Sequence, residues 1–205
     1  MNKKYYIQKT IRIRAGEIRL DESVVLKGKD STFKSFMKEA YHAFDLNYSK
    51  FFKMDELSKL AFLSADILLT SDPESLSWDE NMALVFSNRA SSLTTDRKHQ
   101  QSIADPEAHF PSPAVFVYTL PNICMGEISI KHSLYSENSF FIFDSFNAKH
   151  LFSYTKVLMD QGKASSVLCG WVNVDAENYE SILFLVGTDG ETPFSIQELN
   201  RLYTE

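Results

Sequence analysis

The sequence predicts an α/β protein in which a mostly parallel mixed sheet is covered by helices on both faces. Short, continuously apolar segments are typical of strands buried on both faces, and they occur at 82–86, 139–143 and 165–174. Segments with helical spacing separate them. The chain has 205 residues, of which 44% are hydrophobic, so it is long enough to bury one good core. We therefore expect residues 1–205 to form a single domain.

The first part of the chain is expected to form a strand followed by two helices. Residues 5–13 alternate weakly between apolar and polar side chains, as in a half-buried strand. Segments 32–44 and 55–69 repeat their apolar residues at helical spacing, and Ser31 or Thr32 can cap the first of these helices.

A long middle segment mixes loop and helix signals. Thr94 or Thr95 can cap a short helix. Pro111 and Pro113 mark the entry to a second helix, because proline is well tolerated in a first helical turn. Pro121 then breaks or restarts that helix.

The last part of the chain returns to alternating helices and strands. A helix is expected at 146–161, ending at Gly162. Apolar strands are expected at 165–174 and 181–187, and Ser195 can cap a short C-terminal helix.

The helix expected at 146–161 has an unusually wide apolar stripe. Its members are Phe146, His150, Leu151, Tyr154, Val157 and Leu158, and two further apolar residues, Phe152 and Met159, lie outside it. A helix with this pattern is buried on more than one side. Surplus apolar surface on a chain of this length indicates a partner as well as a core.

Composition excludes several classes of function. The net charge of −6 argues against a nucleic-acid binder that neutralises phosphates. No stretch approaches the roughly 20 apolar residues of a membrane span, and the N-terminus lacks the apolar region of a secretory signal. We therefore expect a cytoplasmic protein with no membrane partner. Cys124 and Cys169, the only cysteines, and the scattered histidines lack metal-ligand spacing, so we expect buried cysteines, no metal site and no cofactor.

One turn raises the question of an active site. Asp144 and Ser145 follow the apolar strand at 139–143 and precede the long helix. A side chain on a tight strand-to-helix turn lies near the positive end of the helix, where many enzymes hold a nucleophile. Ser145 is therefore a candidate nucleophile, and helix capping is the alternative role for both residues.

The order of these segments resembles the β-ketoacyl synthases of the thiolase-like fold. A proline-asparagine-glycine pattern in the family is matched by Pro121, Asn122 and Gly126. The family's long helix is followed by a glycine-rich strand, which is matched by Gln161, Gly162, Lys163, Ala164, Val167, Leu168, Cys169 and Gly170. The resemblance covers about residues 33–187 and implies the N-terminal half of such an enzyme. Counting back from Gly162 without a gap places Ser145 at the family's catalytic cysteine.

Departures from the family pattern change the implied function. The cysteine is absent, and the second half of the family, with its catalytic histidines, has no counterpart here. Serine needs an adjacent base to act as a nucleophile, whereas a cysteine at a helix N-terminus can exist as thiolate. The nearest histidine in sequence, His150, lies more than a turn along the helix. We expect Ser145 to be inert and the chain to have no condensing activity of its own.

A ketosynthase half without these groups looks like a chain length factor. This resemblance implies a non-catalytic subunit that pairs with a full-length ketosynthase in polyketide, aryl polyene or fatty-acid-like synthesis, and that meets an acyl carrier protein indirectly. By position, the residues facing the partner and its acyl channel are Phe116, Tyr118, Thr119, Leu120, Pro121, Asn122 and Met125. Phe116 or Tyr118 would limit chain growth. The alternative is that these aromatics fill the chain's own core.

Other functions stay open. One is a serine-dependent acyltransferase or thioesterase that uses Ser145. Another is a stand-alone homodimeric protein that binds acyl chains or acts as a scaffold. The basic N-terminus could also attract an acidic carrier protein, or it could be a solvated strand face. Its residues are Lys3, Lys4, Lys9, Arg12, Arg14 and Arg19.

Overall fold

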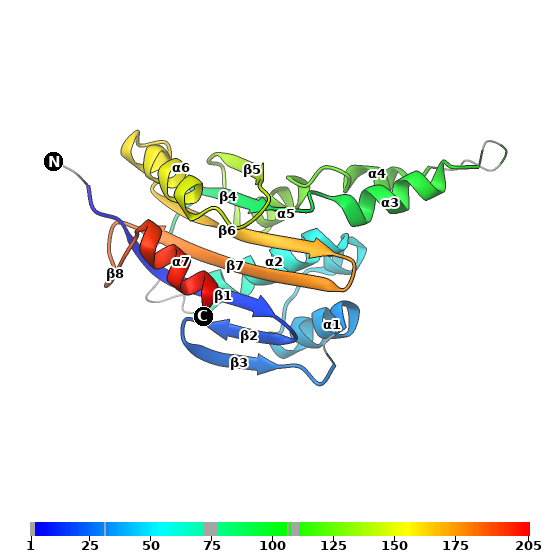
Figure 1. Cartoon of the computed structure of the whole chain (residues 1–205), viewed down its shortest axis with the longest axis horizontal. Coiled ribbons are helices and arrows are strands. Elements are labelled where there is room, and N and C mark those ends of the chain that lie inside the picture. Colours follow the sequence, from blue (N-terminus) through cyan, green and yellow to red (C-terminus); the bar gives the residue numbers. More distant parts are fainter. Residues whose placement is uncertain (1–2, 31, 72–77, 106, 108–110) are drawn as a thin grey trace.

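A computed structural model of the chain describes residues 3–30, 32–71, 78–105, 107 and 111–205. These residues form one sheet with the strand order β3-β2-β1-β7-β6-β4-β5, and a short strand, β8, pairs with β1. Helices lie on both faces of the sheet (Figure 1). The predicted α/β class and the mixed sheet are therefore confirmed.

The elements alternate along the chain, as the sequence predicted, but they include a hairpin that it did not predict. The strands are β1 (Tyr6–Arg14), β2 (Glu17–Leu20), β3 (Ser23–Lys27), β4 (Met82–Asn88), β5 (Asn138–Ile142), β6 (Ser166–Asp175), β7 (Asn178–Gly187) and β8 (Thr192–Pro193). The helices are α1 (Phe33–Ala43), η1 (Ser49–Lys53), α2 (Glu56–Thr70), α3 (Leu93–Ser102), α4 (Pro113–Val117), α5 (Ile123–His132), α6 (Ala148–Asp160) and α7 (Ile196–Thr204).

Strand direction differs from the prediction. Only β5 and β6 run parallel to their neighbour β4, whereas β6, β7, β1, β2 and β3 are joined by antiparallel pairings. The prediction of a mostly parallel sheet is therefore wrong. β7 is buried over most of its length, and burial on both faces removes the alternation that usually marks an antiparallel strand. A two-residue turn at 176–177 joins β6 to β7, with Ala176 at a φ of 55°.

The hairpin of β2 and β3 continues the sheet beyond β1, away from its centre. Ala15 and Gly16, which join β1 to β2, and Asp21, which begins the turn from β2 to β3, all have positive φ. Asp21 ties the hairpin to β1, because its Oδ1 accepts a hydrogen bond from the Thr10 backbone N–H (2.8 Å) and its own N–H donates to the Thr10 carbonyl (3.0 Å). Only Ile18 of β2 is buried, and no residue of β3 is, so neither strand has a strong apolar pattern.

Two hydrophobic clusters fill the spaces on either side of the sheet. One face carries α1, α2 and α5, and the other carries α6 and α7. Helix α2 is buried on nearly all sides between the sheet and α5, since twelve of its fifteen residues are buried. Burial of apolar area on this scale is the main favourable contribution to the stability of a fold.

Helix α6 begins later and faces differently than expected. It starts at Ala148, and its buried residues include Leu151, Leu158 and Met159, whereas Val157 is 47% exposed. The predicted stripe is therefore wrong at Val157, whereas the burial of Met159 outside the stripe agrees with the prediction that the helix is buried on more than one side. The predicted end is confirmed: Gly162 has a φ of 67°, and the Lys163 N–H donates to the Leu158 carbonyl across the last turn.

One of the predicted helix caps is confirmed and others are wrong. Ser195 caps α7 as predicted, since its Oγ accepts a hydrogen bond from the Glu198 N–H (3.2 Å). Helix α3 starts after Ser92 rather than at Thr94 or Thr95. Thr32 precedes α1, but its side chain makes no capping bond, and Ser31 lies outside the described residues. In the part of the chain that the structure describes, no helix combines the length and apolar character needed to cross a membrane.

Candidate functional site

The turn between β5 and α6 holds the candidate nucleophile at the carboxyl end of β4, β5 and β6. Asp144 and Ser145 are both exposed there. Neither caps the helix. Asn147 does so, because its Oδ1 accepts a hydrogen bond from the His150 backbone N–H (2.9 Å). The predicted capping role of Asp144 and Ser145 is therefore wrong, since α6 begins two residues beyond the predicted start.

Ser145 opens onto a cleft of about 660 Å³ at the end of the sheet. The cleft is bounded by the turn between β6 and β7, the end of β1 and the end of α7. Its lining residues are Arg14, Ala15, Arg89, Asp144, Ser145, Trp171, Asn173, Glu177, Asn178, Tyr179, Glu180 and Tyr203. No histidine and no cysteine is among them.

The central carboxylate of this cleft is fully engaged by its neighbours. Glu180 accepts hydrogen bonds from Trp171 Nε1 (2.9 Å) and the Tyr203 hydroxyl (3.2 Å), and it pairs with Arg14 Nη2 (3.0 Å). Burial is the main cause that raises the pKa of Tyr203, and the negative charge of Glu180 is the second cause. These contacts tie β7 to β6, β1 and α7, so Glu180 holds the cleft together and is not available as a base for Ser145.

His150 is turned into an aromatic row and away from the cleft. Its ring centroid lies 4.3 Å from that of Phe141 and 4.9 Å from that of Phe143, and it stacks on Tyr154 at an interplanar angle of 11°. Burial among these rings lowers the pKa of His150. The imidazole is therefore committed to packing between α6 and β5, and Ser145 has no histidine to accept its proton.

Sequence reasoning missed the asparagines that shape the rim of the cleft. Asn173 Oδ1 accepts hydrogen bonds from the backbone N–H groups of Arg89 (3.1 Å) and Ala90 (3.0 Å). Asn88 exchanges two hydrogen bonds with the Ser91 backbone in the same loop. Polar residues at the ends of the apolar segments at 82–88 and 166–175 were the available signal, because a buried amide must find partners.

The segment predicted to face a partner is divided between surface and core. Phe116 is 57% exposed and Leu120 is 54% exposed. Tyr118 packs against the core. Burial, and after it the negative charge of Glu127, raises the pKa of Tyr118 to about 12. Thr119 is joined to α3, since its carbonyl accepts a hydrogen bond from Ser92 Oγ (2.5 Å). Pro121 is half-buried and Asn122 is exposed.

The prediction that Met125 faces a partner is wrong. Its side chain is 0% exposed and belongs to the core cluster between α2 and α5. Cys124 and Ile128, on the same helix, are buried with it. Met125 therefore presents no surface to a partner, because this face of α5 is already covered by α2.

Strand β5 forms one edge of the sheet and pairs with β4 alone among the described strands. The Glu137 carbonyl accepts from the Leu84 N–H, and the Phe143 N–H donates to the Asn88 carbonyl. Because successive backbone groups of a strand point to opposite sides, the N–H and C=O groups of 138, 140 and 142 point outward from the edge. Such an edge is a template for pairing with another strand.

Most of the exposed large apolar side chains among the described residues lie between positions 116 and 157, a stretch that runs from α4 to α6 and includes β5. They are Phe116, Val117, Leu120, Ile130, Tyr135, Ile142 and Val157. Ser129 of α5 accepts a hydrogen bond from Asn138 Nδ2 (3.2 Å), which holds α5 beside the start of β5. The exposed side chain of Ile142 therefore stands on an open backbone edge, with α5 beside the start of the strand.

Two pairs of the basic N-terminal residues differ in their surroundings. Arg14 and Arg19 pair with Glu180 and Glu17 on the sheet, as expected for a solvated strand face. Lys3 and Lys4 lie apart from them, at the beginning of the described chain.

The described residues hold two buried cysteines and no cluster of metal-binding side chains. Cys124 and Cys169 are both buried free thiols, as predicted. Burial raises the pKa of Cys169 to about 12 and also raises that of Cys124, so neither is a reactive thiolate at neutral pH. Across the described ranges, no group of histidine, cysteine and carboxylate side chains is arranged to hold a metal ion.

No protein-family model and no curated protein matches the sequence. Solved structures do. The chain is similar to the ishigamide ketosynthase/chain length factor, with a TM-score of 0.68 and 18% identity over 93% of this chain and 64% of that one. It is similar to a chain of the ketosynthase ApeO in complex with its chain length factor ApeC from Xenorhabdus doucetiae, with a TM-score of 0.61 and 16% identity over 98% and 90% of the two chains.

A further match is a type II PKS acyl-carrier protein in complex with its ketosynthase, AntDE:AntF. The TM-score is 0.59 at 11% identity, over 91% of this chain and 63% of that one. The protein therefore has the thiolase-like fold of ketosynthases and chain length factors, which confirms the expected resemblance at the level of the fold. The chain spans 64% of the length of the first match. Its correspondence to the N-terminal half of such an enzyme stays a prediction.

Proposed function

We propose that the chain is a non-catalytic β-ketoacyl synthase-like subunit of the chain length factor type. It pairs in the cytosol with an active, full-length ketosynthase and shapes that enzyme's acyl channel. The pathway is polyketide, aryl polyene or fatty-acid-like synthesis, with the growing chain on an acyl carrier protein. The observation that carries the proposal is the turn after β5, where an exposed Ser145 stands in a cleft without a histidine.

The chemistry of this turn supports a non-catalytic role. Acyl transfer needs a nucleophile whose proton is removed by a neighbouring base or whose pKa is already low. Ser145 has neither aid, because Glu180 is engaged by three partners and His150 is packed among aromatic rings. Asp144 lies beside the serine and would oppose an oxyanion that formed there.

The open edge of β5 supports a partner. Two of the similar structures are described as a ketosynthase with a chain length factor. In the ApeO–ApeC complex the matched chain is nearly as short as this one, since 98% of this chain covers 90% of it. A ketosynthase strand added along the outward backbone groups of β5 would cover Ile142 and the apolar side chains beside it.

The segment of α4 and the turn after it is our candidate for the channel-facing surface. Phe116 and Leu120 are more than half exposed and have no cover of their own. The Phe116 ring contacts that of His99 on α3, with ring centroids 5.3 Å apart. We propose that Phe116 reaches the partner's acyl channel, while the half-buried Tyr118 packs on this chain's own core.

The partner is tested by co-expression with a full-length ketosynthase whose gene neighbours this one. We expect a stable heterodimer by size-exclusion chromatography and native mass spectrometry. Ile142→Pro removes an outward N–H that β4 does not use, and edge strands tolerate proline at such positions. It leaves a partner carbonyl unpaired, which costs about 1–3 kcal/mol, or roughly 5–150-fold in Kd. Ile142→Ala keeps the N–H and loses only about 1 kcal/mol of apolar contact.

The same complex distinguishes the other functions. Ser145→Ala is expected to leave product formation within twofold of wild type. If a serine-reactive probe labels the wild-type chain at Ser145 and product formation falls in the variant, the chain is a serine acyltransferase or thioesterase. If the chain purifies as a homodimer with no affinity for any ketosynthase, it is a stand-alone scaffold.

A further inference from the structure

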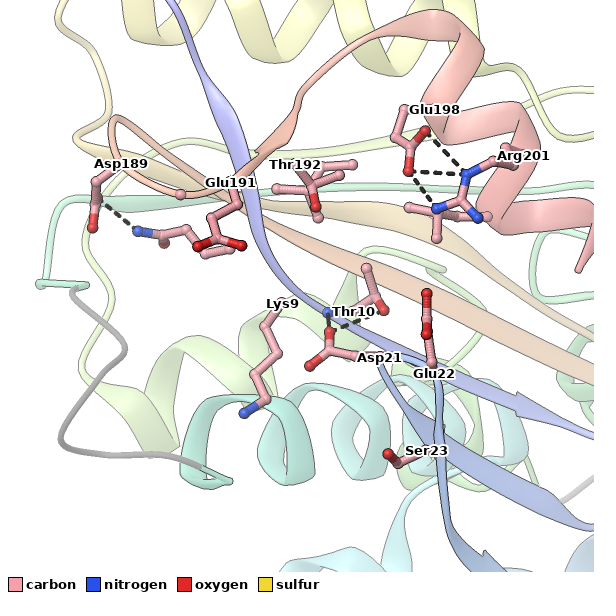
Figure 2. A pocket seen from close by; sticks show the side chains of 14 residues that line it. Lys9, Thr10, Asp21, Glu22, Ser23, Asp189, Glu191, Thr192, Glu198 and Arg201 are labelled. Atoms are coloured by element: carbon pink, nitrogen blue, oxygen red, sulfur yellow. Dashed lines mark hydrogen bonds and ion pairs between the residues drawn. The ribbon is translucent and has the colours of Figure 1, made fainter.

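Two hollows of opposite charge lie on either side of β8. The first, of about 750 Å³, is the groove between β1, the turn before β3 and α7 that Figure 2 shows. Five carboxylates line it, from Asp21, Glu22, Asp189, Glu191 and Glu198, against the cations of Lys9 and Arg201. Arg201 is already paired with Glu198 (2.5 Å). The groove therefore presents a net negative surface.

The second hollow, of about 480 Å³, has an aromatic floor. Phe152 of α6 packs against Phe194, with ring centroids 5.3 Å apart. Tyr5 lies beside them and is fixed by its hydroxyl, which donates to Asp160 Oδ1 (2.8 Å). Its backbone carbonyl also accepts a hydrogen bond from the Phe194 N–H (2.9 Å), so two of the three floor residues are joined to each other.

Three lysines form the rim of this second hollow. Lys156 lies over the Tyr5 ring, with Nζ 5.6 Å from the ring centroid, and pairs with Asp160. Lys3 and Lys4 are exposed and line the same hollow. In a chain whose net charge is −6, a basic rim over an aromatic floor departs from the charge of the rest of the surface.

We infer that this lysine-rimmed hollow docks an acidic amphipathic segment of a partner protein. The apolar side of such a segment fits the floor made by Phe152 and its neighbours, and its carboxylates meet Lys3 and Lys4. The acidic groove on the other side of β8 repels the same segment, which fixes the side on which it binds. Three cations are too few to hold a nucleic acid against the negative charge of the whole chain.

The Lys3 and Lys4 side of the hollow lies away from the proposed ketosynthase contact at β5. In the strand order, β7, β6 and β4 stand between β1 and β5. Lys3 and Lys4 therefore lie on the far side of these strands from the β5 edge, while Phe152 and Lys156 reach the hollow from α6, and the inference does not depend on the proposed function.

The test uses the full chain, in complex with its ketosynthase if it purifies that way, and two fluorescein-labelled helical peptides. One peptide carries glutamates on one face and leucines on the other, and its counterpart carries lysines in place of the glutamates. Fluorescence anisotropy is expected to detect binding of the acidic peptide only, with affinity that falls as salt rises. Lys3→Ser/Lys4→Ser is expected to weaken binding roughly three- to tenfold.

The matched control is Lys34→Ser/Lys38→Ser, which removes the same charge from exposed positions on α1, on the opposite face of the sheet. We expect it to change the affinity less than twofold. Phe152→Ala is expected to weaken binding without changing its salt dependence, with thermal unfolding run beside it to verify the fold. Equal loss in the two double variants, tighter binding of the basic peptide, or no binding at low salt would overturn the inference.

Discussion

Gly170 provides the sharpest test of the packing at the centre of the sheet. It lies in β6 opposite Leu183 of β7. A Cβ atom added at this position would stand 2.0 Å from the Ile182 carbonyl oxygen and 2.9 Å from the Leu183 Cα. Both obstacles are backbone atoms, so Gly170→Ala cannot be accommodated by a side-chain rotation.

The cost of Gly170→Ala follows from that distance. Carbon and carbonyl oxygen atoms in neighbouring strands ordinarily approach to about 3.3 Å, so β6 and β7 must move apart by about 1 Å. The pairing of these strands runs from Val167 to Asp175 along β6, and its hydrogen bonds would lengthen together. Overpacking of a well-packed core costs about 1–3 kcal/mol, and we expect the upper end here because the obstacle is backbone. For a chain of this length the melting temperature would fall by about 6–12 °C.

Gly126 is the matched control. It lies inside α5, and a Cβ added there would meet nothing within 4 Å. Gly126→Ala therefore removes a helix-destabilising residue without a clash and is expected to raise stability by about 0.5–1 kcal/mol. The two glycines belong to the two stretches that resemble the ketosynthases, yet the same substitution is expected to act in opposite directions.

The assay is thermal and urea-induced unfolding of the two variants and the wild type, followed by circular dichroism. A Gly170→Ala variant that melts within 2 °C of wild type would mean that the close approach of β6 and β7 is absent. A loss of stability in Gly126→Ala as large as that in Gly170→Ala would show instead that both sites respond to backbone flexibility and not to space.

Two further predictions concern carboxylates, the buried Asp66 and the half-buried Asp55. Asp66 lies between Lys131 Nζ (2.8 Å) and His132 Nε2 (3.0 Å), and although burial alone would raise its pKa, these neighbours hold the pKa below its usual value. A depressed folded-state pKa gives stability that is present above the unfolded-state value near pH 3.9 and is lost as the pH falls through the folded-state value. Asp66→Asn should therefore cost about 2–3 kcal/mol at pH 7, and the difference from wild type in urea unfolding should shrink below about pH 4. Asp55 caps α2 and accepts a hydrogen bond from Thr95 Oγ1 (2.7 Å), so Asp55→Ala should cost about 2 kcal/mol, and Asp55→Asn clearly less.

Each of these has a contradicting outcome. If the loss in Asp66→Asn is the same at pH 3 as at pH 7, the carboxylate is not held in its charged form by its neighbours. If Asp55→Ala and Asp55→Asn unfold at the same urea concentration, the side chain does not act as a cap or as an acceptor for Thr95.

The sequence by itself determined the elements whose patterns are local. The helices α2 and α7, the strand β4 and the Ser195 cap were all predicted, because each depends on residues a few positions apart. The turn that presents Ser145 was predicted for the same reason, since an apolar strand changes there into helical spacing. The sequence also showed that the nearest histidine, His150, lies more than one helical turn from Ser145.

Only the tertiary structure decided strand direction, the hairpin of β2 and β3, and which side chains the site brings together. Burial of β6 and β7 on both faces removes the alternation that would have revealed an antiparallel pair. The engagement of Glu180 joins residues from β1, β6 and α7, and the burial of Met125 depends on α2, which precedes it by more than fifty residues. These contacts are not local, and a one-dimensional pattern records how apolar a position is but not which neighbour covers it.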